Sequence, residues 1–419
     1  MGLTIEQYSI GIGDRFGRQG HAQLRAVKRA EQEHGVIVAP VWNKSFREHS
    51  LIGTTPGDVR AEADDAVREV GWPWSYYVDA DHVGMKTVES FVAVSNFFTL
   101  DVADFIGRPA ADEAIASFLS DMATFRGPLR IPGVDAAFEV TDALLERVVG
   151  QYLFAMEEAG RVYRRIASAR GSGNFVTEIS VDEAAEPQSP VELFFILAAV
   201  ARQHIPIQTL APKFSGQFLK GIDYVGDLAA FAREFNADIC LLRHASAVFG
   251  LPSQLKISVH TGSDKFSLYP VMHRALKEHG AGLHLKTAGT TWLEEIAGVA
   301  LSGGKGFDIA KRVYTHALSR FEELRKPYAT VVQIDRSRLP SPRDVDRWTA
   351  EQFVRRIRHD SSCPDFNVDM RQLMHIGFKV AAEFGEEFRA ALDSAEGSVG
   401  RLVTDNLFER HIRPLFFGD

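Results

Sequence analysis

Short apolar runs alternate with segments of helical periodicity along most of this 419-residue chain. Runs rich in β-branched and aromatic residues are typical of buried strands, and apolar positions three and four apart are typical of helices that cover a sheet. The segment 266–279, for instance, places Leu268, Val271, Met272 and Leu276 on one helical face. The alternation predicts strands at residues 8–12, 36–41, 75–79, 175–179, 206–210, 256–260, 282–286 and 329–334.

Eight strands that alternate with helices predict a (β/α)8 TIM-like barrel, and a doubly wound parallel sheet is the alternative. Two helical segments interrupt this plan. Residues 97–170 are charged and helical in pattern, with breaks at proline, and they predict an insertion. Residues 341–419 predict a helical C-terminal extension packed on the barrel. We therefore expect a barrel domain over residues 1–340, with the insertion inside it.

The stretch from residue 256 to residue 289 contains two predicted strands, and each carries a histidine followed by polar residues. The first strand ends in His260, and the second contains His284. Strand, helix and strand form a β-α-β unit whose two strands run parallel. Because ligands bind beyond the carboxyl ends of such strands, the two histidines indicate one half of an active site.

Two further strand ends carry groups that suit acid–base or metal chemistry. Asp81 and His82 follow the third predicted strand, and Glu178 lies within the fourth. A glutamate in such an apolar strand is costly unless it is paired or bound to a cation. A barrel brings these residues to the rim that holds His260 and His284. Mixed histidine and carboxylate ligands suit Zn, Mn, Fe, Co or Ni better than Mg or Ca.

Lysines at the same strand ends predict an anionic substrate, because the chain as a whole is acidic, with a net charge of -8. Lys213, Lys265 and Lys286 are the candidates, and Asp264 and Thr287 are further candidate substrate-binding residues. The chemistry suggested is metal-assisted work on a small hydroxylated acid. The net charge argues against nucleic acid as a partner.

Nothing in the sequence pattern predicts a membrane partner or export. The longest apolar run, residues 193–201, is too short to cross a bilayer, and the N-terminus lacks the pattern of a signal peptide. Cys240 and Cys363 lie far apart and without metal-type spacing, so both are expected to be reduced. We therefore expect a cytoplasmic protein, and its assembly into a homo-oligomer stays open.

Five longer motifs carry a family resemblance. They read SIGIGDRFG, YYVDADHVG, TLAPKFSGQFLKGIDYVGD, SVHTGSDKFSLYP and HLKTAGTTWLEE. Over most of residues 8–380 the chain resembles the tagaturonate/fructuronate epimerase family. The resemblance implies a metal-dependent isomerase of hexuronate catabolism that interconverts the keto-uronates D-tagaturonate and D-fructuronate. It also implies an acid/base pair, carried by position to Asp81 and Glu178, and a divalent metal cation held by His82, His260 and His284.

The implied reaction constrains the mechanism. The inverted carbon is β to the ketone, so its C–H is not acidified and enolisation cannot invert it. Retro-aldol cleavage and re-addition on the other face can do so, with an acid/base pair for the proton transfers. Transient oxidation by a nicotinamide is the rival route, but the chain has no dinucleotide fingerprint. The alternative functions are a metal-dependent aldolase or ketose isomerase for a sugar acid, and a non-catalytic sugar-acid binding protein.

Overall fold

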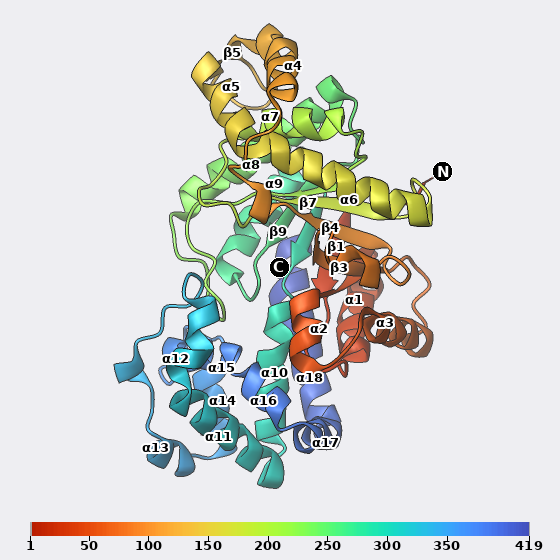
Figure 1. Ribbon diagram of the computed structural model, residues 1–419. Coiled ribbons are helices and arrows are strands. Elements are labelled where there is room, and N and C mark those ends of the chain that lie inside the picture. The colour runs from red at the N-terminus through yellow and green to blue at the C-terminus, as the bar shows by residue number, and fades with distance from the viewer. Residues whose placement is uncertain (1, 419) are drawn as a thin grey trace.

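The computed structural model describes residues 2–418, without the side chain of Ala288, and shows a closed barrel of parallel strands (Figure 1). Around the barrel the strands follow the order β1-β10-β9-β8-β7-β4-β3-β2. Their bounds are β1 (Tyr8–Ile12), β2 (Val38–Ser45), β3 (Tyr77–Val83), β4 (Phe97–Asp101), β7 (Val176–Ser180), β8 (Thr209–Ala211), β9 (Lys256–His260) and β10 (Leu283–Lys286). The predicted (β/α)8 barrel is confirmed, and the carboxyl ends of its strands meet at one rim.

One barrel strand differs from the prediction. β4 pairs with β3 and β7, so a barrel strand lies at the start of the range 97–170 that the sequence pattern predicts to be helical. Its residues Phe97 to Leu100 are buried without alternation, and a short run of this kind gives no strand periodicity.

The strand predicted at residues 329–334 is wrong. This segment follows a 3-10 turn (Lys326–Tyr328) and, within residues 2–418, pairs with no barrel strand. The Val331 carbonyl accepts a hydrogen bond from the Lys220 amide at 2.8 Å. Val332 is buried in an apolar core formed by the C-terminal helices. The β-branched run therefore reflects packing against helices and not a place in the sheet.

Helices surround the barrel, and most of them connect one strand to the next. The connecting helices are α1 (Gly20–His34) after β1, α3 (Pro56–Val70) after β2, α7 (Pro190–Arg202) after β7, α8 (Leu228–Phe249) after β8, α9 (Tyr269–His279) after β9 and α10 (Thr291–Leu301) after β10. After β4 come α4 (Asp112–Met122), the hairpin β5 (Gly127–Leu129) and β6 (Phe138–Val140), α5 (Asp142–Val148) and α6 (Phe154–Arg170). In Figure 1 α4, α5 and the hairpin stand away from the barrel at the top.

The chain after β10 is helical and forms its own apolar core beside α10. This region begins with α11 (Gly304–Ser319) and includes α14 (Ala350–Ile357), α15 (Val368–Ile376) and α16 (Phe378–Glu383), which lie below the barrel in Figure 1. α18 (Glu396–Leu407) packs on α1 and α10, and the π-helical η9 (Phe408–Phe417) packs on α9. The domain boundary at residue 340 stays a prediction. Within residues 2–418, no helix is long and apolar enough to span a membrane.

Candidate active site

Lys286, the last residue of β10, lies at the centre of the rim. Its Nζ is 2.8 Å from Asp79 Oδ2, 2.9 Å from Asp81 Oδ1 and 3.0 Å from Glu178 Oε1. It also donates a hydrogen bond of 2.5 Å to Thr99 Oγ1. Asp79 and Asp81 reach the same lysine because alternate residues of β3 point to one face. We call Asp79, Asp81, Glu178 and Lys286 the acid–base cluster.

The charges of the acid–base cluster shift the pKa of each member. Burial alone would lower the pKa of Lys286, but the three carboxylates outweigh it and raise this pKa well above its ordinary value. Burial would raise the pKa of Asp81, yet Lys286 and His82 lower it to about 2. Burial raises the pKa of Asp79 to about 6 against the opposing charge of Lys286. Asp81 is therefore ionised at neutral pH, whereas Asp79 titrates close to it.

A second group of side chains, His82, Asp182 and His260, lies beside the acid–base cluster. Each offers one nitrogen or carboxylate oxygen, and these three atoms lie within 4.8 Å of one another. His260 Nδ1 is 3.0 Å from Asp182 Oδ2, and its Nε2 is 2.9 Å from Glu178 Oε1. We call these three residues the triad, and Glu178 connects it to the acid–base cluster.

The backbone of β3 is irregular where it delivers His82 to the triad. The pairing of β3 with β4 shifts register between Ala80 and Val83, and His82 has a φ of 51°, in the left-handed region. A bulge of this kind re-aims a side chain near the end of a strand. The His82 ring consequently stands edge-on to the His260 ring, with 5.6 Å between the ring centres.

Asp182 is a member of the triad that the sequence analysis missed. It is the second residue after β7, four residues after Glu178, in the loop 181–189. Burial would raise the pKa of the Asp182 carboxyl, but the contact with His260 holds this pKa well below its ordinary range. An acidic residue just beyond a predicted strand end was the available signal. That loop contains three acidic residues, Asp182, Glu183 and Glu186, so position alone did not single it out.

His284, a predicted metal ligand, lies outside the triad. It faces the barrel interior one layer below Lys286, because residues two apart on β10 share a face. Its Nδ1 is 2.9 Å from Ser9 Oγ, and its Nε2 has no hydrogen-bond partner within residues 2–418. Burial lowers the pKa of His284 to about 3, so the ring is neutral. The structure thus brings His82 and His260 together and leaves His284 deeper in the barrel.

The three lysines predicted to bind a substrate carboxylate are all engaged by protein acceptors. Lys213 Nζ donates to the carbonyls of Ala184 at 2.5 Å and Ala185 at 2.9 Å, and so holds the loop after β7. Lys265 Nζ is buried and donates to the Ile222 carbonyl at 2.9 Å and to neighbouring acceptors. Lys286 is surrounded by the carboxylates described above. These contacts explain the lysines as supports of the rim and its loops.

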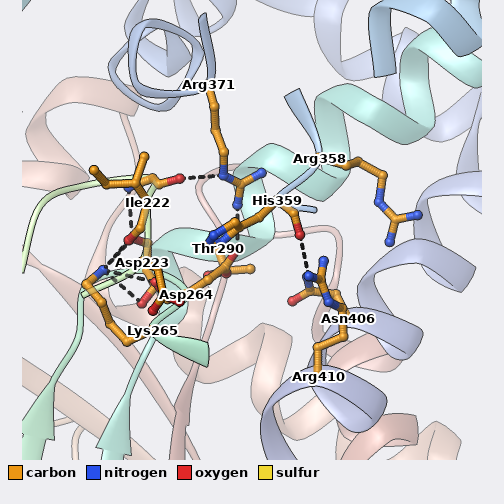
Figure 2. Close-up of polar contacts among 12 residues, drawn as sticks. Ile222, Asp223, Asp264, Lys265, Thr290, Arg358, His359, Arg371, Asn406 and Arg410 are labelled. Carbon is orange, nitrogen blue, oxygen red and sulfur yellow. Dashed lines mark hydrogen bonds and ion pairs between the residues drawn. The ribbon is translucent and has the colours of Figure 1, made fainter. Parts of the chain in front are cut away.

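Asp264 and Thr287, the other predicted substrate-binding residues, are also buried. Asp264 accepts hydrogen bonds from Arg371 Nη2 at 2.5 Å, from His359 Nδ1 at 3.1 Å and from Thr290 Oγ1 (Figure 2). Burial would raise the pKa of Asp264, but Arg371 and the histidines hold it well below its ordinary range. Asp264 therefore ties the loop after β9 to the C-terminal helices. Thr287 Oγ1 has no hydrogen-bond partner in the described part of the chain.

The fold and the site together define the class of this protein. A closed (β/α)8 barrel with convergent ionisable side chains at its carboxyl rim is the arrangement of a barrel enzyme. A model of the tagaturonate epimerase family matches residues 2–389, and the chain belongs to this family. Epimerases are isomerases, so the predicted enzyme class is confirmed.

Individual relatives agree with this family. The chain is 29% identical over 387 residues to the tagaturonate/fructuronate epimerase of Thermotoga maritima, a match that covers 88% of this chain and 72% of that protein. It is similar in fold to the fructuronate-tagaturonate epimerase of Cohnella laeviribosi with one glycerol bound, at a TM-score of 0.80 and 24% identity, over 98% of this chain and 81% of that one. The native structure of the Cohnella protein matches with a TM-score of 0.72 at 25% identity, over 96% of this chain and 82% of that one.

Replacement of Asp264 by Asn tests its role as an anchor. The change leaves Arg371, whose side chain is 0% exposed, without its charged partner, so we expect the free energy of unfolding to fall by roughly 3–5 kcal/mol at pH 7. Because the folded-state pKa of Asp264 is lowered, its contribution is complete above the ordinary aspartate pKa of 3.8 and shrinks as the pH falls below that value. Urea unfolding of both proteins at pH 7 and pH 3 measures the difference.

The exposed Asp346→Asn in α13 (Pro342–Asp346) is the matched control and should leave the free energy of unfolding nearly unchanged. An Asp264→Asn protein as stable as the control variant at pH 7 would contradict the anchoring role.

Proposed function

We propose that this protein interconverts D-tagaturonate and D-fructuronate by metal-dependent epimerisation in hexuronate catabolism. Membership of the tagaturonate epimerase family supports the reaction. The observation that carries the chemistry is the contact between the acid–base cluster and the triad, in which Glu178 Oε1 lies 3.0 Å from Lys286 Nζ and 2.9 Å from His260 Nε2. Proton-transfer groups and metal-type donors are thereby available to one small substrate.

We propose a retro-aldol route, because the inverted carbon is β to the ketone. A base removes the proton from the hydroxyl on that carbon, and the carbon–carbon bond on the ketone side breaks to give an aldehyde and an enediolate. The aldehyde turns, the enediolate adds to its other face, and the new alkoxide takes up a proton. No atom is gained or lost, so the product is an isomer of the substrate.

Asp81 and Glu178 are the proposed proton-transfer groups. The Asp81 side chain is 15% exposed and ionised at neutral pH, so it is the member of the pair that can contact the substrate hydroxyl. The Glu178 side chain is 0% exposed and lies under Lys286 and His260. Glu178 therefore takes part in proton transfer from a position behind these two side chains and not at the exposed surface of the site.

The triad has the donor set of a transition-metal site. Two imidazoles and one carboxylate suit Zn, Mn, Ni, Co or Fe, and their donor atoms all lie within 4.8 Å of one another, so one ion could be shared among them. His82 and His260 would bind it as neutral imidazoles. A divalent cation held there would supply positive charge that stabilises the negative charge developing on substrate oxygens.

Product analysis tests the reaction. Purified protein supplied with divalent metals should convert D-tagaturonate into D-fructuronate, and the reverse, with no fragments detected by NMR and mass spectrometry. Three-carbon fragments as the main product would indicate an aldolase, and an aldose product would indicate a ketose isomerase. Binding without turnover under every metal would leave a sugar-acid binding protein and would overturn the proposal.

Metal content tests the triad separately from activity. His260→Ala and Asp182→Ala each remove one of three donors. Loss of a residue that only supports a ligand typically lowers metal affinity by about 10- to 100-fold, so loss of a donor should lower it at least as much, and elemental analysis should find a strongly reduced metal content in both variants. His284→Asn is the control, since His284 lies outside the triad, and should retain its metal. Circular dichroism checks that all three variants fold. Loss of metal from His284→Asn and its retention in His260→Ala would reverse the assignment.

Asp81→Asn and Glu178→Gln test the proton-transfer pair. Each change is nearly isosteric and removes a basic oxygen, so kcat should fall by about 100- to 10,000-fold while the metal content and substrate affinity change far less. Asp104→Asn, an exposed residue of the 3-10 turn after β4, is the control and should keep its activity. If Glu178→Gln loses its metal while folded, Glu178 is a metal ligand and another residue completes the pair.

A further inference from the structure

The proposed function requires a cation for the substrate carboxylate, and Lys213, Lys265 and Lys286 are engaged by protein acceptors. Lys220, in the loop between β8 and α8, is different. Within residues 2–418, no carboxylate oxygen lies within 4.0 Å of the Lys220 ammonium nitrogen. Burial and the charge of Arg15 lower the pKa of Lys220, and the charges of Asp182 and Asp81 oppose this shift. Lys220 therefore pairs with neither the triad nor the acid–base cluster, although charges of both act on it.

The Lys220 ammonium is held against the backbone that follows His260. A Cβ built on Gly262 would lie 2.6 Å from Lys220 Nζ, and Gly262 has a φ of 64°, which favours glycine. A Cβ on Gly289, in the loop after β10, would lie 2.0 Å from the Gly262 carbonyl oxygen. The two glycines allow these loops to approach each other closely, and they place the ammonium group at the carboxyl ends of β9 and β10.

His375 of α15 adds a polar group to the same place. Its side chain is 3% exposed, and its Nδ1 has no hydrogen-bond partner within the described residues. A Cβ on Gly289 would lie 3.2 Å from His375 Cε1, so the ring borders the same glycine loop. Burial and then the charge of Lys220 hold the pKa of His375 well below its ordinary value, so the ring is neutral and can donate one N–H.

Further positive charge surrounds this position in an otherwise acidic protein. Arg15, in the loop after β1, and the exposed Arg47, in α2 (Phe46–Ile52), both act electrostatically on Lys220. Arg15 pairs with Glu48, whereas Arg47 forms no ion pair among residues 2–418. Lys220 and Arg47 are therefore two cations without a carboxylate partner among residues 2–418, and positive charge of this kind attracts an anionic ligand.

We propose that Lys220, assisted by His375, binds the carboxylate of the keto-uronate while the reacting carbons lie over Asp81 and the triad. This inference rests on the proposed function and extends it to the recognition of the acid. In the retro-aldol step the carboxylate stays with the aldehyde fragment, because it lies at the end of the chain remote from the ketone. Lys220 would therefore retain that fragment while it turns, so that it re-adds and does not leave.

The test compares two unreactive six-carbon ligands, D-galactonate and galactitol, which differ only in a carboxylate for a hydroxymethyl group. Calorimetry on the wild-type protein should show tighter binding of D-galactonate. In Lys220→Met the affinity for D-galactonate should fall by about 10- to 100-fold, the usual effect of a lost hydrogen bond to a charged group, and galactitol should bind as before. Lys277→Met, on the exposed face of α9, is the matched control and should keep the preference.

Two further measurements sharpen the test. Lys220→Gln repeats the charge removal with a polar side chain, in case Lys220→Met does not fold. With keto-uronate as substrate, either variant should raise KM and release three-carbon fragments that the wild type retains.

The outcomes separate the carboxylate assignment from the proposed reaction. If both folded Lys220 variants prefer D-galactonate as strongly as the wild type, the carboxylate assignment is overturned even in an active epimerase. If the wild type prefers D-galactonate but converts no keto-uronate, the proposed reaction fails and the anion site stands. Equal losses for D-galactonate and galactitol would mean that Lys220 shapes the site and does not bind the acid.

Discussion

The ion pairs of Lys286 are the interaction on which the geometry of the rim depends. Three carboxylates from β3 and β7 converge on one ammonium group of β10, which also bonds to Thr99 of β4. To bury such charges costs several kcal/mol for each ion unless partners compensate it. Lys286 provides that compensation, and it can do so because the barrel closes and brings β10 opposite β3 and β7 across the interior.

The compensation by Lys286 is incomplete, and this has a chemical consequence. Four carboxylates, of Asp79, Asp81, Glu178 and Asp182, face three groups that can carry positive charge, and these are Lys286, His260 and His82. The excess of negative charge favours a bound cation at the triad. The charges of the site also separate the proton affinities of the two β3 aspartates, because burial raises the pKa of Asp79 whereas Lys286 and His82 lower the pKa of Asp81. Asp182 and Asp81 also act electrostatically on Lys220, which pairs with neither.

The C-terminal helices complete the rim of the barrel. Asp264 joins the loop after β9 to Arg371 of α15, and Arg371 also donates to the Gly221 carbonyl at 2.5 Å. The loop that carries Lys220 is therefore held by the same arginine that binds Asp264. Through these contacts the loops after β8 and β9 and helix α15 form one supported unit, although Arg371 of α15 lies more than a hundred positions after Gly221 and Asp264.

The sequence by itself determined the barrel, the rim and the kinds of side chain at it, because strand runs and helical periodicity are local properties. His82, Glu178 and His260 were placed at the rim in this way. β4 was missed because a short strand buried on both faces has no alternation, and 329–334 was misread because β-branched residues also pack against helices. Only the tertiary structure decided which groups meet. His284 lies one layer below the rim, Asp182 completes the triad, and Lys213 and Lys265 bond to backbone carbonyls. Partners of this kind come from distant segments, and no local pattern records the register and loop paths that bring them within a few ångströms.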